Sequence, residues 1–579
     1  MSKVGYSLSD IIDLDDLRNL PYEFIKTFKP KNLQAKGYPI WTRKGDTNAF
    51  FTLFFDSLVT QLGMMSNAYI VGFTPDFVYK HFMGGLTVSL FVGNVYYALQ
   101  ASKVAMETGK MDTCAQPYGV NTPGAIAKTF GVLAPALALA SAEGLDTEAA
   151  MTKAWSVACA ANFVGGLVEF AGAFLAVLVF KLVPYGAMLV PIGGVGMTWL
   201  GYAYFIQVVA PPDIDFPIVP IIPFFILWVS FFGNTSTLTG PVPSVLAACI
   251  MGIVLYVCVD AGRYKDHFGP AAELVGEASF SLPDLSEGFK ELSKYGSLVA
   301  SLAFTSFIGT YACNIQARVG GDIFSPMESM MVDGLGTMIG ALCGSPWGTT
   351  VYIGHTTYKK FGATRGYSAL CGIFFLVFGL SGLYGILDSL IPHDIYVGIL
   401  ACIGMLIAGQ CVEVTPKRWY PAIMMGLAIC WSDMIQVWGA DNRPFTDGVN
   451  DILVLSPSYL WTSMLWTFLL MMLIDRWWAS ATVILLVMTF LTSVGLIHSG
   501  EISVDYTAGH HDGARTLSPA TWKIIVSYAA GAGVTAIYAA LQRKGIGPPA
   551  EEEDFRIVQQ EKYGTNKKDP PKDAEAEEA

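Results

Sequence analysis

Two segments combine proline, glycine and hydroxyl side chains inside otherwise apolar sequence. The first runs from Pro117 to Gly124 and reads PYGVNTPG; the second runs from Ser345 to His355 and reads SPWGTTVYIGH. Backbone groups at membrane depth must be hydrogen-bonded, so a broken helix is tolerated only where protein or a water-filled cavity surrounds it. A matched pair of broken segments in the two halves of a chain points to the binding site of a membrane carrier. The alternative is a pair of structural kinks.

The two segments carry side chains that can hydrogen-bond a small polar solute. Residues 349–355 alternate at period two, which places Thr350 and Tyr352 on one face and His355 on the other. A half-helix beginning after each segment would present N–H groups and a positive dipole end to a carbonyl or anionic group. The expected substrate-binding residues are Tyr118, Gly119, Asn121, Thr122, Ser306, Thr310, Asn314, Thr349, Thr350, Tyr352 and His355.

Acidic side chains inside apolar stretches are the candidates for coupling transport to an ion. Asp56 begins a face that continues at positions i+4, i+7 and i+11 with Thr60, Gly63 and Asn67. A carboxylate at the centre of a membrane helix costs about 2.5–3.5 kcal/mol on insertion scales, so it should face the interior. Asp56 is therefore either a proton, cation or ligand site, or a hydrogen-bonding partner that positions its helix.

Other titratable residues have weaker claims to a coupling role. His355 can change charge near neutral pH and so can couple protons, or it can be a fixed hydrogen-bonding partner. Glu169 is a lone acid in the expected core half and is a further coupling candidate, whereas Asp433 is expected to cap or pair. The basic residues Lys359, Lys360 and Arg365 are expected to form a solvated cluster.

A further helix face brings small and polar residues together. Ser306, Gly309, Thr310, Cys313 and Ala317 share this face, and Asn314 lies beside it. Small residues allow close helix approach in membranes. The face is either a packing surface or a neutral hydrogen-bonding wall of the binding site.

Composition defines the class of protein that must position these residues. The chain is 53% hydrophobic and 14% charged, whereas soluble domains carry roughly 25% charged residues. Apolar stretches near the length of about 20 residues that spans a bilayer recur along the chain. The sequence therefore predicts an all-α polytopic membrane protein with a small-molecule substrate and no nucleic-acid partner. The 10 cysteines are scattered without metal-type spacing, and no catalytic, cofactor or metal site is expected beyond a co-transported H⁺ or Na⁺.

Sixteen apolar spans are expected. Seven lie before a long polar loop, near 48–73, 84–101, 120–141, 154–180, 186–209, 216–233 and 238–259. Seven follow it, near 296–317, 327–344, 349–362, 366–390, 394–413, 419–437 and 457–474, and two more lie near 478–499 and 520–542. An odd-numbered repeat must insert upside down relative to its copy, which is the inverted-repeat layout of secondary transporters. Lysines and arginines alternate with acidic turns, which places both termini in the cytoplasm. The expected divisions are a cytoplasmic segment 1–47, a first repeat 48–259, an extracytoplasmic loop 260–295, a second repeat 296–475, two additional spans 476–542 and an acidic disordered cytoplasmic tail 543–579.

Three motifs together bring a known family to mind. The sequence GSPWGTTVYIGH at 344–355, followed by GATRGYS at 362–368, resembles the tenth span of xanthine/uracil permease-like proteins. DGLGT at 333–337 and QPYGVNTPG at 116–124 are similar to the ninth and third spans of the same nucleobase:cation symporter-2 (nucleobase–ascorbate) family. The resemblance is strong across 295–370, fair across 50–135 and faint elsewhere.

The resemblance implies a fourteen-span fold shared with sulfate transporters. Spans 1–4 and 8–11 would form a core domain, spans 5–7 and 12–14 a gate domain, and the substrate would sit where two short strands in spans 3 and 10 meet. It implies a structural Asp333, a homodimer, and alternating access of core against gate. A plasma-membrane location is also expected.

One feature departs from that family. Its nucleobase carriers usually hold a carboxylate in span 8, yet residues 304–316 contain no acid, and His355 stands where span 10 often has another. The first hypothesis is therefore a secondary transporter for a nucleobase such as xanthine, uracil or a purine, or for a related heterocycle. The alternatives are an anion transporter of the sulfate or bicarbonate kind, or a non-transporting membrane scaffold or sensor.

Overall fold

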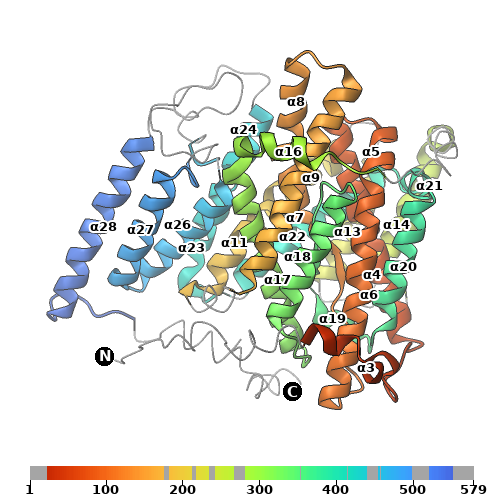
Figure 1. Ribbon diagram of the computed structural model, residues 1–579, viewed down its shortest axis with the longest axis horizontal. Coiled ribbons are helices and arrows are strands. Elements are labelled where there is room, and N and C mark those ends of the chain that lie inside the picture. Colours follow the sequence, from red (N-terminus) through yellow and green to blue (C-terminus); the bar gives the residue numbers. More distant parts are fainter. Residues whose placement is uncertain are drawn as a thin grey trace.

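The computed structural model is a bundle of helices that run roughly side by side (Figure 1). It describes residues 23–174, 182–211, 217–233, 242–265, 281–352, 354–413, 415–439, 454–456, 458–498 and 521–551. The tail beyond 551, residues 266–280 of the 260–295 loop and residues 1–22 of segment 1–47 lie outside the described residues. The expected disorder of the tail therefore stays a prediction.

The helices of the first half follow the predicted apolar spans closely. They are α3 (Pro30–Gln34), α4 (Gly45–Ile70), α5 (Pro75–His81), α6 (Met83–Thr108), α7 (Thr122–Lys128), α8 (Ala134–Ala142), α9 (Thr147–Gly172), α11 (Tyr185–Val195), α12 (Ala203–Val209), α13 (Ile218–Phe232) and α14 (Ser244–Val259). Two π-helical segments, η1 (Thr129–Leu133) and η2 (Gly196–Tyr202), join α7 to α8 and α11 to α12.

The second half repeats the alternation of long helices and one broken segment. Its helices are α16 (Leu285–Glu291), α17 (Gly296–Val319), α18 (Pro326–Leu342), α19 (His355–Lys360), α20 (Gly366–Leu380), α21 (Tyr384–Leu390), α22 (His393–Glu413), α23 (Tyr420–Ile429), α24 (Trp431–Gly439), α26 (Tyr459–Ile474), α27 (Trp478–Ser493) and α28 (Thr521–Arg543), with 3-10 turns η3 (Leu292–Tyr295) and η4 (Lys417–Trp419).

Several helices are long and apolar enough to cross a membrane. Six qualify among the described residues, or up to eight if each of two bent pairs is one span. Four shorter apolar helices, α13, α14, α26 and α27, add to them. The protein is thus a multi-pass membrane protein, while the expected total of sixteen spans stays a prediction. The span expected at 366–390 is not straight, because α20 and α21 meet at 99°.

Two short strands pair across the whole length of the chain. Strand β1 (Tyr118–Val120) runs antiparallel to β2 (Thr349–Val351), with Gly119 opposite Thr350. Backbone bonds from Asn121 N to Gly348 O (2.9 Å) and from Tyr352 N to Pro117 O (2.7 Å) extend the ladder. The fold class is as expected: a helical membrane protein in which two broken segments meet as strands. Antiparallel pairing is what two inversely oriented repeats require.

The helices pack most extensively within two groups. One contains α6, α9, α17, α18 and α20; the other contains α11, α13, α22, α23 and α26. Helices α4, α7 and α17 surround the β1–β2 ribbon. They also contact α11 or α22 of the second group, or the adjoining segment η2. The pair α27 and α28 packs together and lies at one edge of the bundle (Figure 1). The β1–β2 ribbon is therefore held by the first group, close to its boundary with the second.

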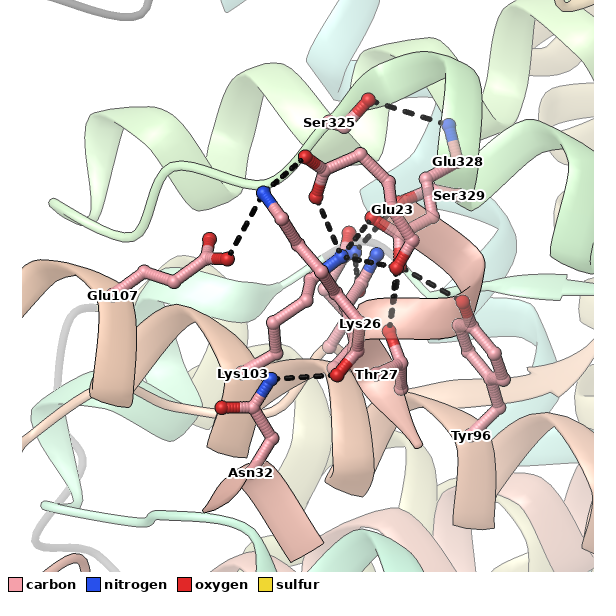
Figure 2. Close-up of polar contacts among 12 residues, drawn as sticks. Glu23, Lys26, Thr27, Asn32, Tyr96, Lys103, Glu107, Ser325, Glu328 and Ser329 are labelled. Atoms are coloured by element: carbon pink, nitrogen blue, oxygen red, sulfur yellow. Dashed lines mark hydrogen bonds and ion pairs between the residues drawn. The ribbon is translucent and has the colours of Figure 1, made fainter. Parts of the chain in front are cut away.

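The N-terminal segment is fastened to the first group by a charged network (Figure 2). Lys103 of α6 donates to Glu328 of α18 (2.6 Å) and to Glu23 (3.2 Å). Glu328 also accepts from Tyr96 (2.8 Å) and Thr27 (3.3 Å). Ser325 and Glu328 have the spacing of a capping box at the start of α18. Lys103 and Glu328 are 2% and 1% exposed, so this ion pair is buried and needs both partners.

Candidate functional site

The β1–β2 ribbon has two faces with different surroundings. Tyr118 and Thr349 point to one face, and both are almost completely buried. Thr350 and Tyr352 point to the other face and are partly exposed. The Tyr352 ring lies directly over Gly119, where a Cβ would collide with it. The alternation predicted for 349–355 is present over 349–352 only, because β2 ends at Val351, residue 353 lies outside the described residues and His355 begins helix α19. Gly119 is required by the approach of an aromatic ring.

The buried face ties the ribbon to its supporting helices. The hydroxyl of Tyr118 lies 2.7 Å from that of Thr349, which also meets Ser89 of α6. Thr337 of α18 donates to the carbonyl of Thr349 at 3.1 Å. Tyr118 and Thr349, both expected to bind substrate, are placed here behind the ribbon. Their hydrogen bonds hold the two strands in place, and their side chains do not lie on the partly exposed face of the ribbon.

The exposed face gathers polar groups at the junction of β1 and α7. Asn121 donates to Ser306 of α17 at 2.7 Å, and both side chains are partly exposed. The side-chain oxygen Oδ1 of Asn121 accepts from Gly124 N at 3.1 Å, which caps α7. Thr122 is buried and bonds to the carbonyl of Val120. Of these sequence-predicted residues, Asn121 and Ser306 share one small surface, whereas Thr122 turns inward.

Helix α4 brings a carboxylate to the same face. Asp56 is partly exposed, and it lies near enough to the Tyr352 hydroxyl to act on it electrostatically. That hydroxyl is buried beside Ser57 and Thr60, yet it makes no hydrogen bond among the described residues. The Asp56 carboxylate also accepts no hydrogen bond in the part of the chain that the structure describes. Both polar groups are thus without a hydrogen bond among the described residues, with Ser57 and Thr60 close to the Tyr352 hydroxyl.

The rest of the predicted α4 face has a packing role. Tyr204 of α12 donates to Asn67 at 3.2 Å and to the carbonyl of Gly63 at 3.3 Å. A Cβ on Gly63 would collide with Leu400 of α22. This part of the face therefore joins α4 to the second group of helices, which is the positioning alternative.

A chain of hydrogen bonds links two buried acids to the ribbon. Thr310 of α17 lies 2.8 Å from Glu169 of α9 and 2.7 Å from Asp333 of α18. Asp333 also accepts from Thr350 (3.1 Å) and from Val351 N (3.0 Å), and Tyr97 bonds to its other oxygen. Glu169 is 1% exposed and Asp333 is not exposed. Asp333 thus holds β2 in place, and Glu169 joins it through one hydroxyl.

A buried cation, Lys128, lies beside the ribbon and was not among the residues predicted from the sequence. Lys128 of α7 is 6% exposed, and its ammonium bonds to Asn162 of α9. It lies 3.4 Å from the position that a Cβ on Gly348 would take. Lys128 falls seven residues after Asn121 in an apolar run, so a lone intramembrane lysine was the available signal.

His355 is placed away from the exposed face of the ribbon. Its Nε2 lies 2.9 Å from Asp322, which also accepts from Lys359 (2.8 Å) and from Cys114 N (3.0 Å). His355 and Asp322 are both about 1% exposed. The pair joins the segment before β1 to the helix after β2. Asp322 was missed because nothing local in the sequence marks it as the partner of His355.

Two further expectations differ from the arrangement found. Asn314 is buried and bonds to Ser329 of α18 at 3.0 Å, so it supports α17 rather than the ribbon surface. Arg365 is 9% exposed and donates to Ser102 at 2.7 Å. Arg365 therefore does not belong to a solvated cluster, because the N-terminal segment around Tyr38 covers it.

At the helix ends near the ribbon, some N–H groups are already hydrogen-bonded or absent. Asn121 caps Gly124 N, Pro123 has no N–H, and Gln316 accepts from Gly354 N at 2.8 Å. This reduces the anion-binding capacity that the sequence suggested for the two half-helix ends. Among the described residues, no group of three or more His, Cys, Asp or Glu side chains is arranged to hold a metal ion.

Comparison with known proteins found distant structural likenesses. No family model and no curated protein sequence matches the chain. The transmembrane domain of a cyanobacterial bicarbonate transporter, BicA, is similar with 14% identity and a TM-score of 0.42, over 72% of this chain and 98% of that one.

Two further solved structures are similar at the same level. One is SLC26A9, with 13% identity and a TM-score of 0.49 over 82% of this chain and 72% of that one. The other is the murine Slc26a9 anion transporter in its inward-facing state, with 13% identity and a TM-score of 0.42 over 82% and 73% of the two chains. Likeness at this distance assigns no substrate. What stands is a multi-pass membrane protein with a polar site where two short strands cross.

Proposed function

We propose that the protein is a secondary transporter that binds an uncharged heterocycle of the nucleobase kind between α4 and the β1–β2 ribbon. The observation that carries this proposal is the orphaned Tyr352 hydroxyl beside Asp56. Buried polar groups are nearly always hydrogen-bonded, so a buried hydroxyl without a hydrogen bond indicates that a ligand or water binds there. A solute entering between α4 and β2 would supply that partner.

The donors and acceptors at this place suit a planar ring with both N–H and C=O groups. A ring N–H can donate to the carboxylate of Asp56, and a ring carbonyl can accept from Tyr352. Asn121 and Thr350 border the same face of the ribbon and offer further polar contacts. A buried hydrogen bond of this kind is worth about 1–3 kcal/mol when its loss leaves a group unpaired.

The position of the site supports transport rather than simple binding. The ribbon belongs to the first group of helices, and α4, α7 and α17 meet the second group next to it. A rigid movement of one group against the other would open the site to either side in turn. The homodimer and plasma-membrane location expected from the family resemblance form part of this proposal.

An anion is the second candidate substrate, and Lys128 favours it. Within the described part of the chain its buried ammonium makes one hydrogen bond, to Asn162, and it lies against Gly348 at the start of β2. The partly exposed carboxylate of Asp56 would repel an anion at the exposed face of the ribbon. For this reason we rank the heterocycle above the anion as substrate. The two candidate substrates would therefore contact different charged groups: the heterocycle Asp56, and the anion Lys128.

Uptake into proteoliposomes containing the purified full-length protein tests the proposal. Labelled xanthine and labelled uracil are the probes, with sulfate and bicarbonate as competitors. We expect uptake of at least one nucleobase that Asp56→Asn weakens strongly, while Asp433→Asn, a buried acid of α24 outside the site, leaves it unchanged.

Three outcomes would decide against the nucleobase assignment. Competition by sulfate or bicarbonate with loss of uptake in Lys128→Met would make the protein an anion carrier. Uptake of all probes by the Asp56→Asn variant at the wild-type rate would place the solute elsewhere. No transport of nucleobase or anion by folded protein would favour a scaffold or sensor.

A further inference from the structure

The hydrogen bonds of Thr310 require one more proton than is present if both neighbouring acids, Glu169 and Asp333, are ionised. Its hydroxyl oxygen lies 2.8 Å from Glu169 Oε1 and 2.7 Å from Asp333 Oδ2. A hydroxyl has one hydrogen to donate, and an ionised carboxylate can only accept. Both distances are those of hydrogen bonds between oxygens. One of the two carboxyl groups must therefore supply a second hydrogen.

The other donors around the pair decide which acid carries the proton. Asp333 accepts from Tyr97 on one oxygen, and from Thr350 (3.1 Å) and Val351 N (3.0 Å) on the other. Hydrogen bonds donated to a carboxylate favour its charged form. Glu169 has Thr310 as its sole hydrogen-bond partner among the described residues. The proton belongs on Glu169, which donates to Thr310, and Thr310 in turn donates to Asp333.

The charge balance around the pair also calls for one proton shared between the two acids. The ammonium of Lys128, 6% exposed, forms no ion pair within the described residues. Lys128 acts electrostatically on Glu169 and can compensate only one of the two acids, so with both Glu169 and Asp333 ionised one buried negative charge is uncompensated. The titratable groups that act on these three side chains are Tyr97 of α6, Tyr118 of β1, Cys159 of α9 and Cys313 of α17. An uncompensated buried charge is costly, so the balanced state holds one exchangeable proton.

We propose that Glu169 holds the proton that drives solute transport, and that Thr310 transmits its loss to strand β2. When the O–H bond of Glu169 breaks, the electron pair stays on the carboxylate and the proton passes to water on the open side. Thr310 then faces two acceptors with one hydrogen, and one of its two short contacts becomes repulsive. Thr350, which lies 3.0 Å from Thr310 and bonds to Asp333, carries that change to the solute side of the ribbon.

The position of the proton can be measured without any substrate. Infrared spectroscopy of the reconstituted full-length protein at neutral pH reports the C=O stretch of a protonated carboxyl group. We expect such a band in the wild type, its loss in Glu169→Gln, and its retention in Asp433→Asn. A band that survives unchanged in Glu169→Gln would overturn the assignment, as would the absence of any band in the wild type.

The coupling role rests on the proposed transport function, and a second measurement separates the two. Glu169→Gln keeps an N–H that can donate to Thr310 and so mimics the protonated acid. With labelled xanthine or uracil as probe, we expect this variant to retain exchange across proteoliposome membranes but to lose accumulation driven by a pH gradient. Accumulation equal to that of the wild type would refute the coupling role.

Variants of Thr310 test the transmission step. Thr310→Ser keeps the hydroxyl and should preserve gradient-driven accumulation, whereas Thr310→Val removes it and should abolish accumulation while the infrared band of Glu169 persists. Equal accumulation in both variants would exclude Thr310 as the link. Failure of wild-type protein to exchange either nucleobase would reject the proposed function, while the infrared result would still locate the proton.

Discussion

At the scale of single residues, the site is recognised by what its side chains lack. Tyr118 begins β1 and Tyr352 follows β2, yet Tyr118 is paired with Thr349 while the Tyr352 hydroxyl has no partner among the described residues. A paired hydroxyl stabilises the fold, whereas an orphaned one costs desolvation energy until a ligand arrives. The two tyrosines therefore separate a structural role from a binding role.

Replacing each tyrosine by phenylalanine tests this difference. Tyr352→Phe should weaken nucleobase affinity by about 1–3 kcal/mol, roughly 5- to 150-fold, because the ring stays and only the orphaned hydroxyl goes. Its thermal stability without solute should be unchanged or higher. Tyr118→Phe should lower stability while leaving the affinity of the folded protein intact. Binding and unfolding measurements on both purified variants check this, and the reverse pattern would contradict the placement of the site.

At the scale of elements, the ribbon depends on close approach between strands and helices. Gly119 makes room for the Tyr352 ring, because a Cβ there would overlap it. Gly119→Ala should therefore displace Tyr352 and reduce nucleobase uptake strongly while the protein still reaches the membrane. Gly409→Ala in α22, where a Cβ meets nothing within 4 Å, is the matched control and should transport normally. Normal uptake by Gly119→Ala would show that the ring position is unimportant.

The N-terminal segment is the second element whose attachment can be tested. Lys103→Met leaves Glu328 buried without its cation, which should destabilise the protein by about 3–5 kcal/mol. Lys153→Met breaks a more exposed pair with Glu143 at the other end of the bundle and should cost at most about 1 kcal/mol. Thermal unfolding in detergent compares them. Adding Glu328→Gln to Lys103→Met should recover part of the loss; no recovery would mean the damage is steric.

At the scale of the whole molecule, the arrangement of helices bears on membrane topology. Helix α16 lies at one end of the bundle, whereas α3 and the Arg543 end of α28 lie at the other (Figure 1). Among the described residues, α3 and the end of α28 therefore lie opposite the 281–295 part of the loop. Which side is cytoplasmic follows from the basic turns alone.

Cysteine labelling in intact cells measures that orientation. In a background with the exposed Cys258 replaced by serine, Glu287→Cys should react with a membrane-impermeant maleimide from outside. Lys544→Cys should react only after the membrane is permeabilised. Labelling of both positions from one side would contradict the expected topology, and exchanged labelling would invert it.

The sequence alone determined the helical elements and the broken segments between them. The apolar stretches near 48–73 and 296–317 correspond to α4 and α17 within a few residues. They could be predicted because a helix that crosses a bilayer needs about 20 predominantly apolar residues in a row. Period-two alternation likewise placed Thr350 and Tyr352 on one face of a strand. These features depend on neighbours in the chain, so local pattern suffices.

Only the tertiary structure decided which side chains meet. Thr310 joins Glu169 across 141 positions and Asp333 across 23, and His355 finds Asp322 across 33. Lys128 of α7 and Asn162 of α9 meet beside Gly348, just before β2, and no motif in either helix indicates this contact. Hydrogen bonds between helices depend on rotation and depth in the bundle, and these are set by packing of the whole chain. The predicted residues therefore separated into a buried support and a partly exposed face only once the two strands were paired.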